Sequence, residues 1–167
     1  AVPLPNRADS PEKEGDVHPW LKHHLATYDT NSALVEKMVV GQKTAATALS
    51  DAEIRQLRAT YYGMINEVED NFTRILDRLK ESGEYDQTLI VLTSDHGEQS
   101  GDHWLFSKTG FFDESYRVPL IIRDPRPEAQ AGRGRKVQAI TESVDVTPTI
   151  LHALGAPNPR QVDGKPL

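Results

Sequence analysis

The sequence predicts an α/β fold, because one long amphipathic helix is followed by two short apolar segments of strand type and a further helix. We expect helices over residues 51–81 and 145–154 and strands over 88–93 and 118–123. The length of 167 residues is that of one domain, since about 100 to 200 residues per domain is usual. The expected architecture is a mixed or parallel sheet flanked by helices.

The first part of the chain, residues 1–45, is expected to form an extended N-terminal arm or linker, and residues 46–167 the domain itself. Prolines occur at positions 3, 5, 11 and 19 with little apolar periodicity between them. Within the arm, apolar residues that share one helical face predict a short helix over 32–40.

The helix over 51–81 has clear start and stop signals. Ser50 and Glu53 have the spacing of a capping box, and Gly83 is placed to end the helix. Apolar residues recur every three or four positions and predict one continuous stripe that faces a core. They are Ile54, Leu57, Tyr61, Met64, Ile65, Val68, Phe72, Ile75, Leu76 and Leu79.

The strands are predicted from continuous apolar runs. Such runs are typical of strands covered on both faces, so Val91 and Ile121 are expected to be buried between neighbouring strands and helices. Residues 137–141 are expected to add a short third strand.

The last helix, over 145–154, is predicted from its end signals. Asp145 or Thr147 would cap it, Pro148 lies in its first turn, and Gly155 would terminate it.

Composition excludes several classes of function. The chain has no cysteine, so any metal must be held by oxygen or imidazole. The formal net charge is −6, and the one basic cluster, at 133–136, is expected to be a solvated turn, so no nucleic-acid partner is expected. No apolar run is long enough to cross a membrane and no secretory signal is seen, so the expected location is the cytoplasm.

Asp95 and His96 directly follow the first predicted strand, where ligand sites of open α/β sheets lie. The turn that Gly97 allows can bring the carboxylate and the imidazole toward one point, which suits a divalent metal. Two ligands are too few for tight binding, so others must come from elsewhere in the fold. A strand-end turn in which Asp95 bonds local N–H groups explains the same residues.

A polar and aromatic loop of about twenty residues joins the two strands, and loops of that length are more often functional than idle. Lys108 in this loop would suit a phosphate, phosphonate or sulfate ester, and the imidazole of His103 could donate to a leaving oxygen. The alternative is that Lys108 is merely exposed, Asp102 and His103 pair locally, and aromatic residues including Trp104 pin the loop down.

Several motifs in this order resemble the C-terminal part of the sulfatase family of the alkaline phosphatase superfamily, most closely its phosphonate monoester hydrolase and phosphodiesterase branch. The resemblance covers about residues 55–167. The motifs are YYGMI at 61–65, SDHGE at 94–98, GDHW at 101–104, Lys108, YRVPLIIRDP at 116–125, DVTPTIL at 145–151 and DG at 163–164.

The resemblance implies part of an alkaline-phosphatase-like sandwich and a metal-assisted hydrolysis of small phosphonate, phosphate or sulfate esters. Asp95 and His96 match two of the family's metal ligands, and Lys108 matches its lysine on the substrate's non-bridging oxygens. His103 lines the same loop in a supporting catalytic role. The metal would be Mn, Zn, Ca or Mg, and the N-terminal arm could pack on a neighbouring subunit of a homo-oligomer.

The family's nucleophile, a formylglycine made from a Cys/Ser-x-Pro-x-Arg motif, has no counterpart in this sequence. The chain therefore resembles the C-terminal portion of such an enzyme, and by itself it is expected to be inactive. Two alternatives stay open: a non-catalytic binding module derived from the same fold, and another metal-dependent member of the superfamily.

Overall fold

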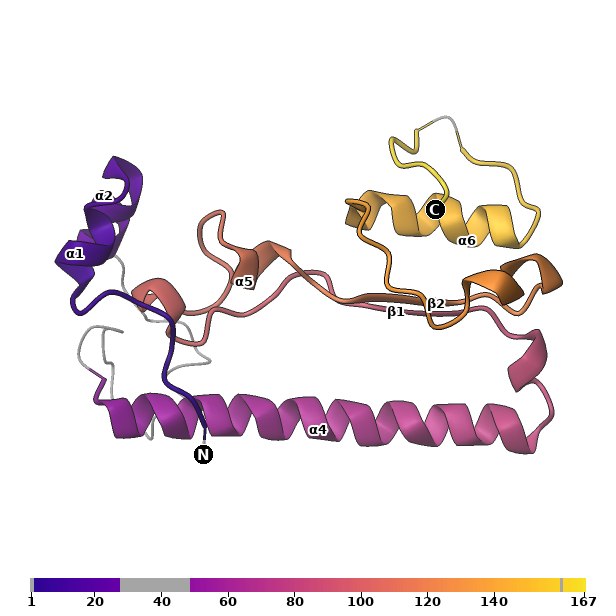
Figure 1. Ribbon diagram of the computed structural model, residues 1–167, viewed down its shortest axis with the longest axis horizontal. Coiled ribbons are helices and arrows are strands. Elements are labelled where there is room, and N and C mark those ends of the chain that lie inside the picture. Colours follow the sequence, from indigo (N-terminus) through magenta and orange to yellow (C-terminus); the bar gives the residue numbers. More distant parts are fainter. Residues whose placement is uncertain (1, 28–48, 160) are drawn as a thin grey trace. The chain divides into compact units, whose positions relative to one another are not determined.

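A computed structural model describes residues 2–27, 49–159 and 161–167 (Figure 1). The helix predicted over 32–40 and the expected boundary near residue 45 lie outside these ranges. Among the described residues, no helix combines the length and the apolar character that crossing a bilayer requires.

The chain folds into two compact units, each built from two stretches of sequence. The first unit comprises Ala1–Thr73 and His96–Val118, and the second comprises Arg74–Asp95 and Pro119–Leu167. The residues predicted to act on a substrate are therefore divided between the units, with Asp95 in the second unit.

The N-terminal segment contains two short helices, α1 (Pro11–Gly15) and α2 (Pro19–Thr27), which contact each other. The expectation of an extended arm is therefore wrong for these residues. Both helices begin at a proline. Proline has no backbone N–H, and at the first position of a helix an N–H would have no acceptor within the helix. The Ser10 hydroxyl also accepts a hydrogen bond from the backbone N–H of Lys13 and caps α1.

The long helix α4 spans Asp51–Glu81, and its predicted end signals are confirmed. The Glu53 N–H donates to the Ser50 hydroxyl at 3.3 Å, and the Ser50 N–H donates to the Glu53 carboxylate at 2.8 Å, which is a complete capping box. Past the helix, Gly83 adopts the left-handed region with φ of 75° and returns its N–H to the carbonyl of Lys80.

Only the first turns of α4 are buried. Ile54 and Leu57 pack with Leu49 and Phe106 into the apolar core of the first unit. Farther along the helix, Val68 is 63% exposed and Ile75 is 58% exposed. The prediction of a stripe buried along its whole length is therefore wrong for the described chain: the apolar side chains that would cover the later turns are not supplied by these residues.

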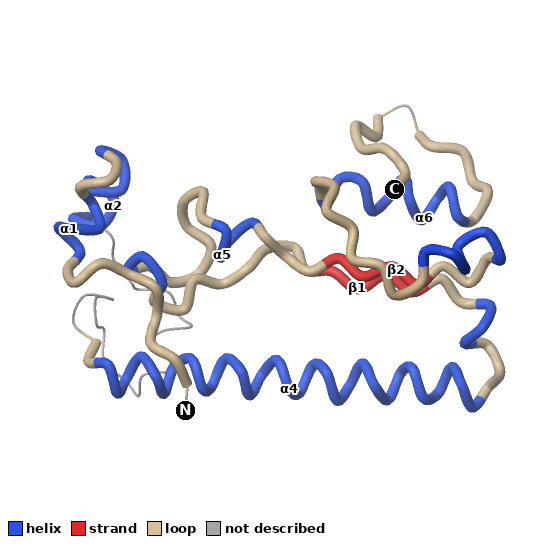
Figure 2. The backbone as a smooth tube through the Cα atoms, in the orientation of Figure 1, coloured by secondary structure: helices blue, strands red, loops and turns tan. Residues whose placement is uncertain are grey.

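The second unit contains a two-stranded sheet of β1 (Ile90–Thr93) and β2 (Leu120–Arg123), drawn in red in Figure 2. The strands run antiparallel, with Ile90 opposite Arg123 and Thr93 opposite Leu120. The prediction that these segments are neighbouring strands is confirmed, within the α/β class. The pairing is antiparallel, which a mixed sheet includes and a wholly parallel sheet does not.

Coverage of the sheet differs from the prediction. Val91 is half-buried but Ile121 is 59% exposed, so the second strand is not covered on both faces. The third strand predicted over 137–141 does not form, and Val137 and Ile140 in that segment are exposed. A strand needs a neighbour for its hydrogen bonds, and the described sheet consists of β1 and β2 alone.

The last helix, α6, spans Val146–Ala153 and follows a 3-10 turn at Ser143–Asp145. The Asp145 carboxylate accepts the backbone N–H groups of Glu142 at 3.0 Å and Lys165 at 2.9 Å. It therefore caps the start of the helical segment and also holds the C-terminal residues. As predicted, Gly155 ends the helix, in the left-handed region with φ of 67°.

Candidate active site

Asp95 and His96 lie just past the end of β1, with Ser94 between the strand and Asp95, close to where the sequence predicts them. The Asp95 side chain is exposed and His96 is half-buried. His96 and Lys108 belong to the first unit and Asp95 to the second. The convergence of all three on one substrate therefore stays a prediction.

The ring of His96 is held in one tautomer. Its Nδ1 lies 2.8 Å from the carbonyl oxygen of Gly97, and because a carbonyl only accepts, Nδ1 carries the hydrogen. In the neutral ring Nε2 is then the nitrogen with the lone pair. This is the state in which a histidine binds a metal through Nε2 while a carbonyl orients its other nitrogen.

Gly97 fixes the turn that follows His96. Its N–H donates to the carbonyl of Ser115 at 2.8 Å, in the short helix α5 (Asp113–Tyr116). A Cβ atom at position 97 would overlap the carbonyl oxygen of Glu114. Only glycine fits between the turn after His96 and α5.

Glu98 and Gln99 hold the segment that carries Lys108. The Glu98 carboxylate accepts the N–H of Ser107 at 2.6 Å, and the Gln99 side-chain amide donates to the carbonyl of Thr109 at 2.6 Å. Gln99 is fully buried, whereas the Lys108 side chain is exposed. The lysine therefore projects into solvent from a backbone that is anchored on both sides of it.

The backbone of this loop is strained. Four non-glycine residues have positive φ: Ser100, His103, Trp104 and Ser107. Such conformations cost on the order of 1 kcal/mol per residue and persist only where surrounding contacts enforce them, often at functional sites.

The Asp102–Trp104 turn binds the N-terminal segment. The Asp102 carboxylate accepts the backbone N–H of Asn6 and a guanidinium N–H of Arg58, the latter at 3.3 Å. The Trp104 indole N–H donates to the carbonyl of Ala8 at 3.0 Å. The alternative in which Asp102 and His103 pair locally is therefore wrong, because both make contacts across the chain.

Both ring nitrogens of His103 face carboxylates. Nδ1 lies 2.9 Å from Glu14 in α1, and Nε2 lies 3.3 Å from Glu114 in α5. The ring also stacks on Phe112, with 3.9 Å between centroids. The imidazole is therefore occupied by groups of the protein itself.

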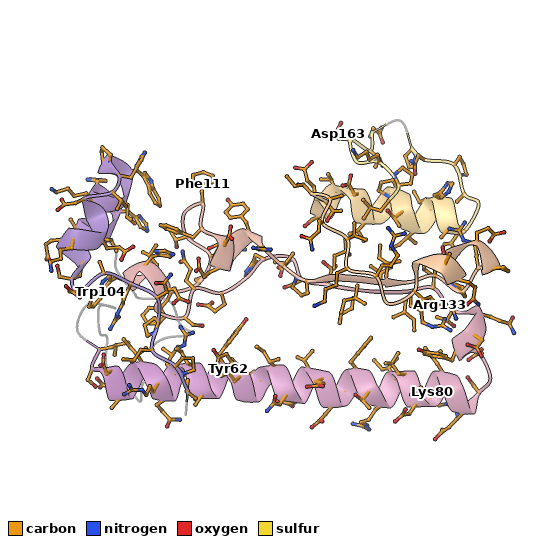
Figure 3. All side chains as sticks on the ribbon, in the orientation of Figure 1. Tyr62, Lys80, Trp104, Phe111, Arg133 and Asp163 are labelled. Atoms are coloured by element: carbon orange, nitrogen blue, oxygen red, sulfur yellow. The ribbon has the colours of Figure 1, made fainter. Side chains whose placement is uncertain are left out.

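The aromatic residues of the loop divide into two kinds. Trp104 and Phe112 are engaged, Trp104 under the guanidinium of Arg7 at 3.7 Å, and they secure the loop as expected. Phe111 is 89% exposed and stacks with Tyr116, so it does not pin the loop (Figure 3).

The described residues hold no group of three or more histidine, aspartate or glutamate side chains placed to bind an ion. A divalent ion of the type that Asp95 and His96 suit takes about four to six ligands. By themselves, Asp95 and His96 would supply only part of such a ligand set.

The roles of Glu98, Gln99 and Glu14 were not predicted from the sequence. Glu98 and Gln99 directly follow the Asp95-His96-Gly97 segment, and this polar pair beside a predicted site is the one local signal of their contacts. Nothing local indicates that Gln99 is buried or that Glu14 meets His103 from 89 positions away.

A comparison with protein families matches residues 16–156 to the family described as Sulfatase. Among curated proteins, the chain is 42% identical over 166 residues to the multifunctional alkaline phosphatase superfamily protein PehA of Trinickia caryophylli, covering 99% of this chain and 31% of that protein. It is 32% identical to arylsulfatase K of Xenopus laevis, covering 73% of this chain and 22% of that protein.

Among solved structures, the phosphonate monoester hydrolase of Agrobacterium radiobacter superposes with a TM-score of 0.85 at 41% identity. The match covers 99% of this chain and 31% of that one. The chain thus spans about a third of the length of these relatives.

Proposed function

This chain belongs to the sulfatase family of the alkaline phosphatase superfamily, and from that premise we propose that it is part of a metal-dependent ester hydrolase. In this proposal it supplies two ligands of a divalent metal, Asp95 and His96, and an anion-binding lysine, Lys108. The relatives that support the proposal carry the names of hydrolases of sulfate or phosphonate esters.

The observation that carries this proposal is the fold of the loop after β1. His96 is oriented through Nδ1, and two residues later Glu98 bonds the N–H of Ser107, next to Lys108. An oriented imidazole and a cation on one anchored loop form half of a site for an oxyanion.

Each residue has a distinct role in the proposed site. Asp95 and His96 would hold the ion, whose chemistry when bound is to polarise the ester as a Lewis acid. Lys108 binds a non-bridging oxygen of the phosphoryl or sulfuryl group as a point charge. His103 supports the site by holding the loop to α1 and α5, since both of its nitrogens are engaged there.

The substrate class that the relatives favour is a phosphonate or phosphate ester. The phosphonate monoester hydrolase is 41% identical to this chain, whereas the arylsulfatase is 32% identical. The formylglycine nucleophile that the family resemblance implies has no counterpart among these 167 residues. The metal is Mn, Zn, Ca or Mg.

The test is hydrolysis of aryl phosphonate, aryl phosphodiester and aryl sulfate esters by the intact protein that carries this chain. Lys108→Ala should lower kcat/KM by about 100-fold or more, since loss of one donor to a charged transition state costs about that much. Lys80→Ala, an exposed lysine paired with Asp77, is the matched control and should leave turnover unchanged. Equal rates for the Lys108 variant and the parent protein would reject the proposed role of the lysine, and no turnover of any ester would favour a binding module.

A further inference from the structure

We propose that Glu98 and Gln99 are positioning residues that fix Lys108 for the substrate oxyanion. The inference rests on the proposed function, in which Lys108 touches the substrate. Neither residue needs to touch the substrate itself, since both act on the backbone on either side of the lysine.

Glu98 holds the loop on the N-terminal side of Lys108. A single oxygen of its carboxylate accepts the N–H of Ser100 at 2.9 Å and that of Ser107 at 2.6 Å. Bonds from N–H groups to an ionised carboxylate are stronger than those between neutral groups. They join the two ends of a turn whose residues Ser100 and Ser107 both have positive φ, so the carboxylate sustains a conformation that the chain alone disfavours.

Gln99 holds the loop through the residues on both sides of Lys108. Its backbone N–H donates to the carbonyl of Ser107 at 2.9 Å, and its side-chain N–H donates to the carbonyl of Thr109 at 2.6 Å. The Gln99 amide is fully buried, and its Oε1 has no hydrogen-bond partner among the described residues. The contribution of the Gln99 side chain to the loop is therefore the hydrogen bond that its amide N–H donates to Thr109.

Lys108 benefits from this anchoring because its own side chain is long and flexible. Four rotatable bonds separate the ammonium group from the backbone. The position of the charge is therefore well defined only if the backbone at Lys108 is fixed. Displacing a catalytic group by about 1 Å can cost about 100-fold in rate. The pair Glu98 and Gln99 also follows His96 by two and three residues, which ties the position of the lysine to the proposed metal ligand.

The structural half of the proposal is tested by hydrogen exchange of the Ser107 amide in the intact protein. Glu98→Ala should speed this exchange by at least about 10-fold, because the amide loses its acceptor. Glu98→Gln keeps an oxygen acceptor and should restore protection, while Glu69→Ala, an exposed residue of α4, should change nothing. Unchanged exchange in Glu98→Ala would overturn the assignment.

The functional half is tested by a double-mutant cycle with Lys108→Ala. Glu98→Ala and Gln99→Met, the latter a side chain of similar length without the donor, should each lower kcat/KM by about 10- to 100-fold when Lys108 is present. In the Lys108→Ala background the same changes should have little effect, because there is no lysine left to position. Equal losses in both backgrounds would mean a general structural role and overturn the inference.

The two proposals can fail separately. If Lys108→Ala alone leaves turnover intact, the proposed function of the lysine fails whatever the exchange data show. If Lys108→Ala abolishes turnover while Glu98→Ala and Gln99→Met do not, the function stands and the positioning role is overturned. Should Glu98→Ala fail to fold, Glu98→Gln and Gln99→Met carry the same comparison.

Discussion

The imidazole of His103 and the carboxylate of Glu14 lie 2.9 Å apart although 89 positions separate them in the chain. The contact joins α1 to the loop that carries Lys108. With the second contact to Glu114 it makes His103 the link between three segments of the first unit.

Replacing His103 with alanine should destabilise the protein by about 1–3 kcal/mol. The Glu14 and Glu114 side chains are only 11% and 27% exposed, and the substitution leaves both carboxylates without this partner. Urea denaturation measures the change in the free energy of unfolding. Lys13→Ala is the control, since its pair with Asp9 is exposed at both ends, and it should leave that free energy unchanged. A His103 variant as stable as the Lys13 variant would contradict the role of His103 as a link.

Gly97→Ala should destabilise the protein and weaken any metal binding by Asp95 and His96. The added methyl group would overlap the Glu114 carbonyl oxygen, so the turn or α5 must move. The control is Gly63→Ala in α4, where no atom of the described residues lies near the new methyl group and helix propensity predicts a gain of roughly 0.5–1 kcal/mol. Thermal denaturation of the two variants should shift in opposite directions, and equal shifts would contradict this account of Gly97.

The stability of the folded protein at acidic pH should depend on the ionisation of Asp145. Hydrogen bonds from the backbone N–H groups of Lys165 and Glu142 hold the pKa of the Asp145 carboxyl below its ordinary value near 3.8. A carboxyl with a depressed pKa stabilises the fold fully above the ordinary value and loses that contribution as the pH falls through the lower folded value. Asp145→Asn should therefore be less stable than the parent at pH 7, with the difference in unfolding free energy shrinking below about pH 4. A difference that stays constant from pH 7 to 2 would contradict the assignment.

Residues 1–167 alone should bind divalent metal weakly and hydrolyse esters poorly. An ion that receives two protein ligands, where about four to six are usual, stays largely hydrated. Catalytic groups that act as a unit lose most of their combined rate enhancement when one of them is missing. Calorimetric titration with Mn, Mg, Ca and Zn measures the affinity. Tight binding abolished by Asp95→Ala would show that the described residues form a more complete site than their geometry indicates.

The sequence predicted well those features that depend on neighbouring residues. The capping box of Ser50 and Glu53 and the stop at Gly83 are local, so α4 begins and ends where expected. The turn at Gly97 after the strand is local as well.

Features that depend on distant partners were not predictable. The segment 137–141 has the composition of a strand, but strands form only beside other strands. The exposure of α4 around Val68 was unpredictable for the same reason. Amphipathic periodicity shows which face of a helix is apolar, but it does not show which residues cover that face. Asp95, His96 and Lys108 were predicted as site residues from their residue types and motifs, and their roles stay predictions. The buried amide of Gln99 that anchors the lysine segment required the structure.

The measurement that tests the central proposal most directly is turnover of an aryl phosphonate ester by the intact protein before and after removal of its metal, with Asp95→Ala beside it. Chelation should abolish turnover in the parent protein, and adding Mn or Zn should restore it. Asp95→Ala should stay inactive with either metal, whereas Asp86→Ala, an exposed aspartate that pairs with Arg123, should behave as the parent. Metal-independent turnover, or an Asp95 variant as active as the parent, would contradict the assignment of this chain to the metal site of an ester hydrolase.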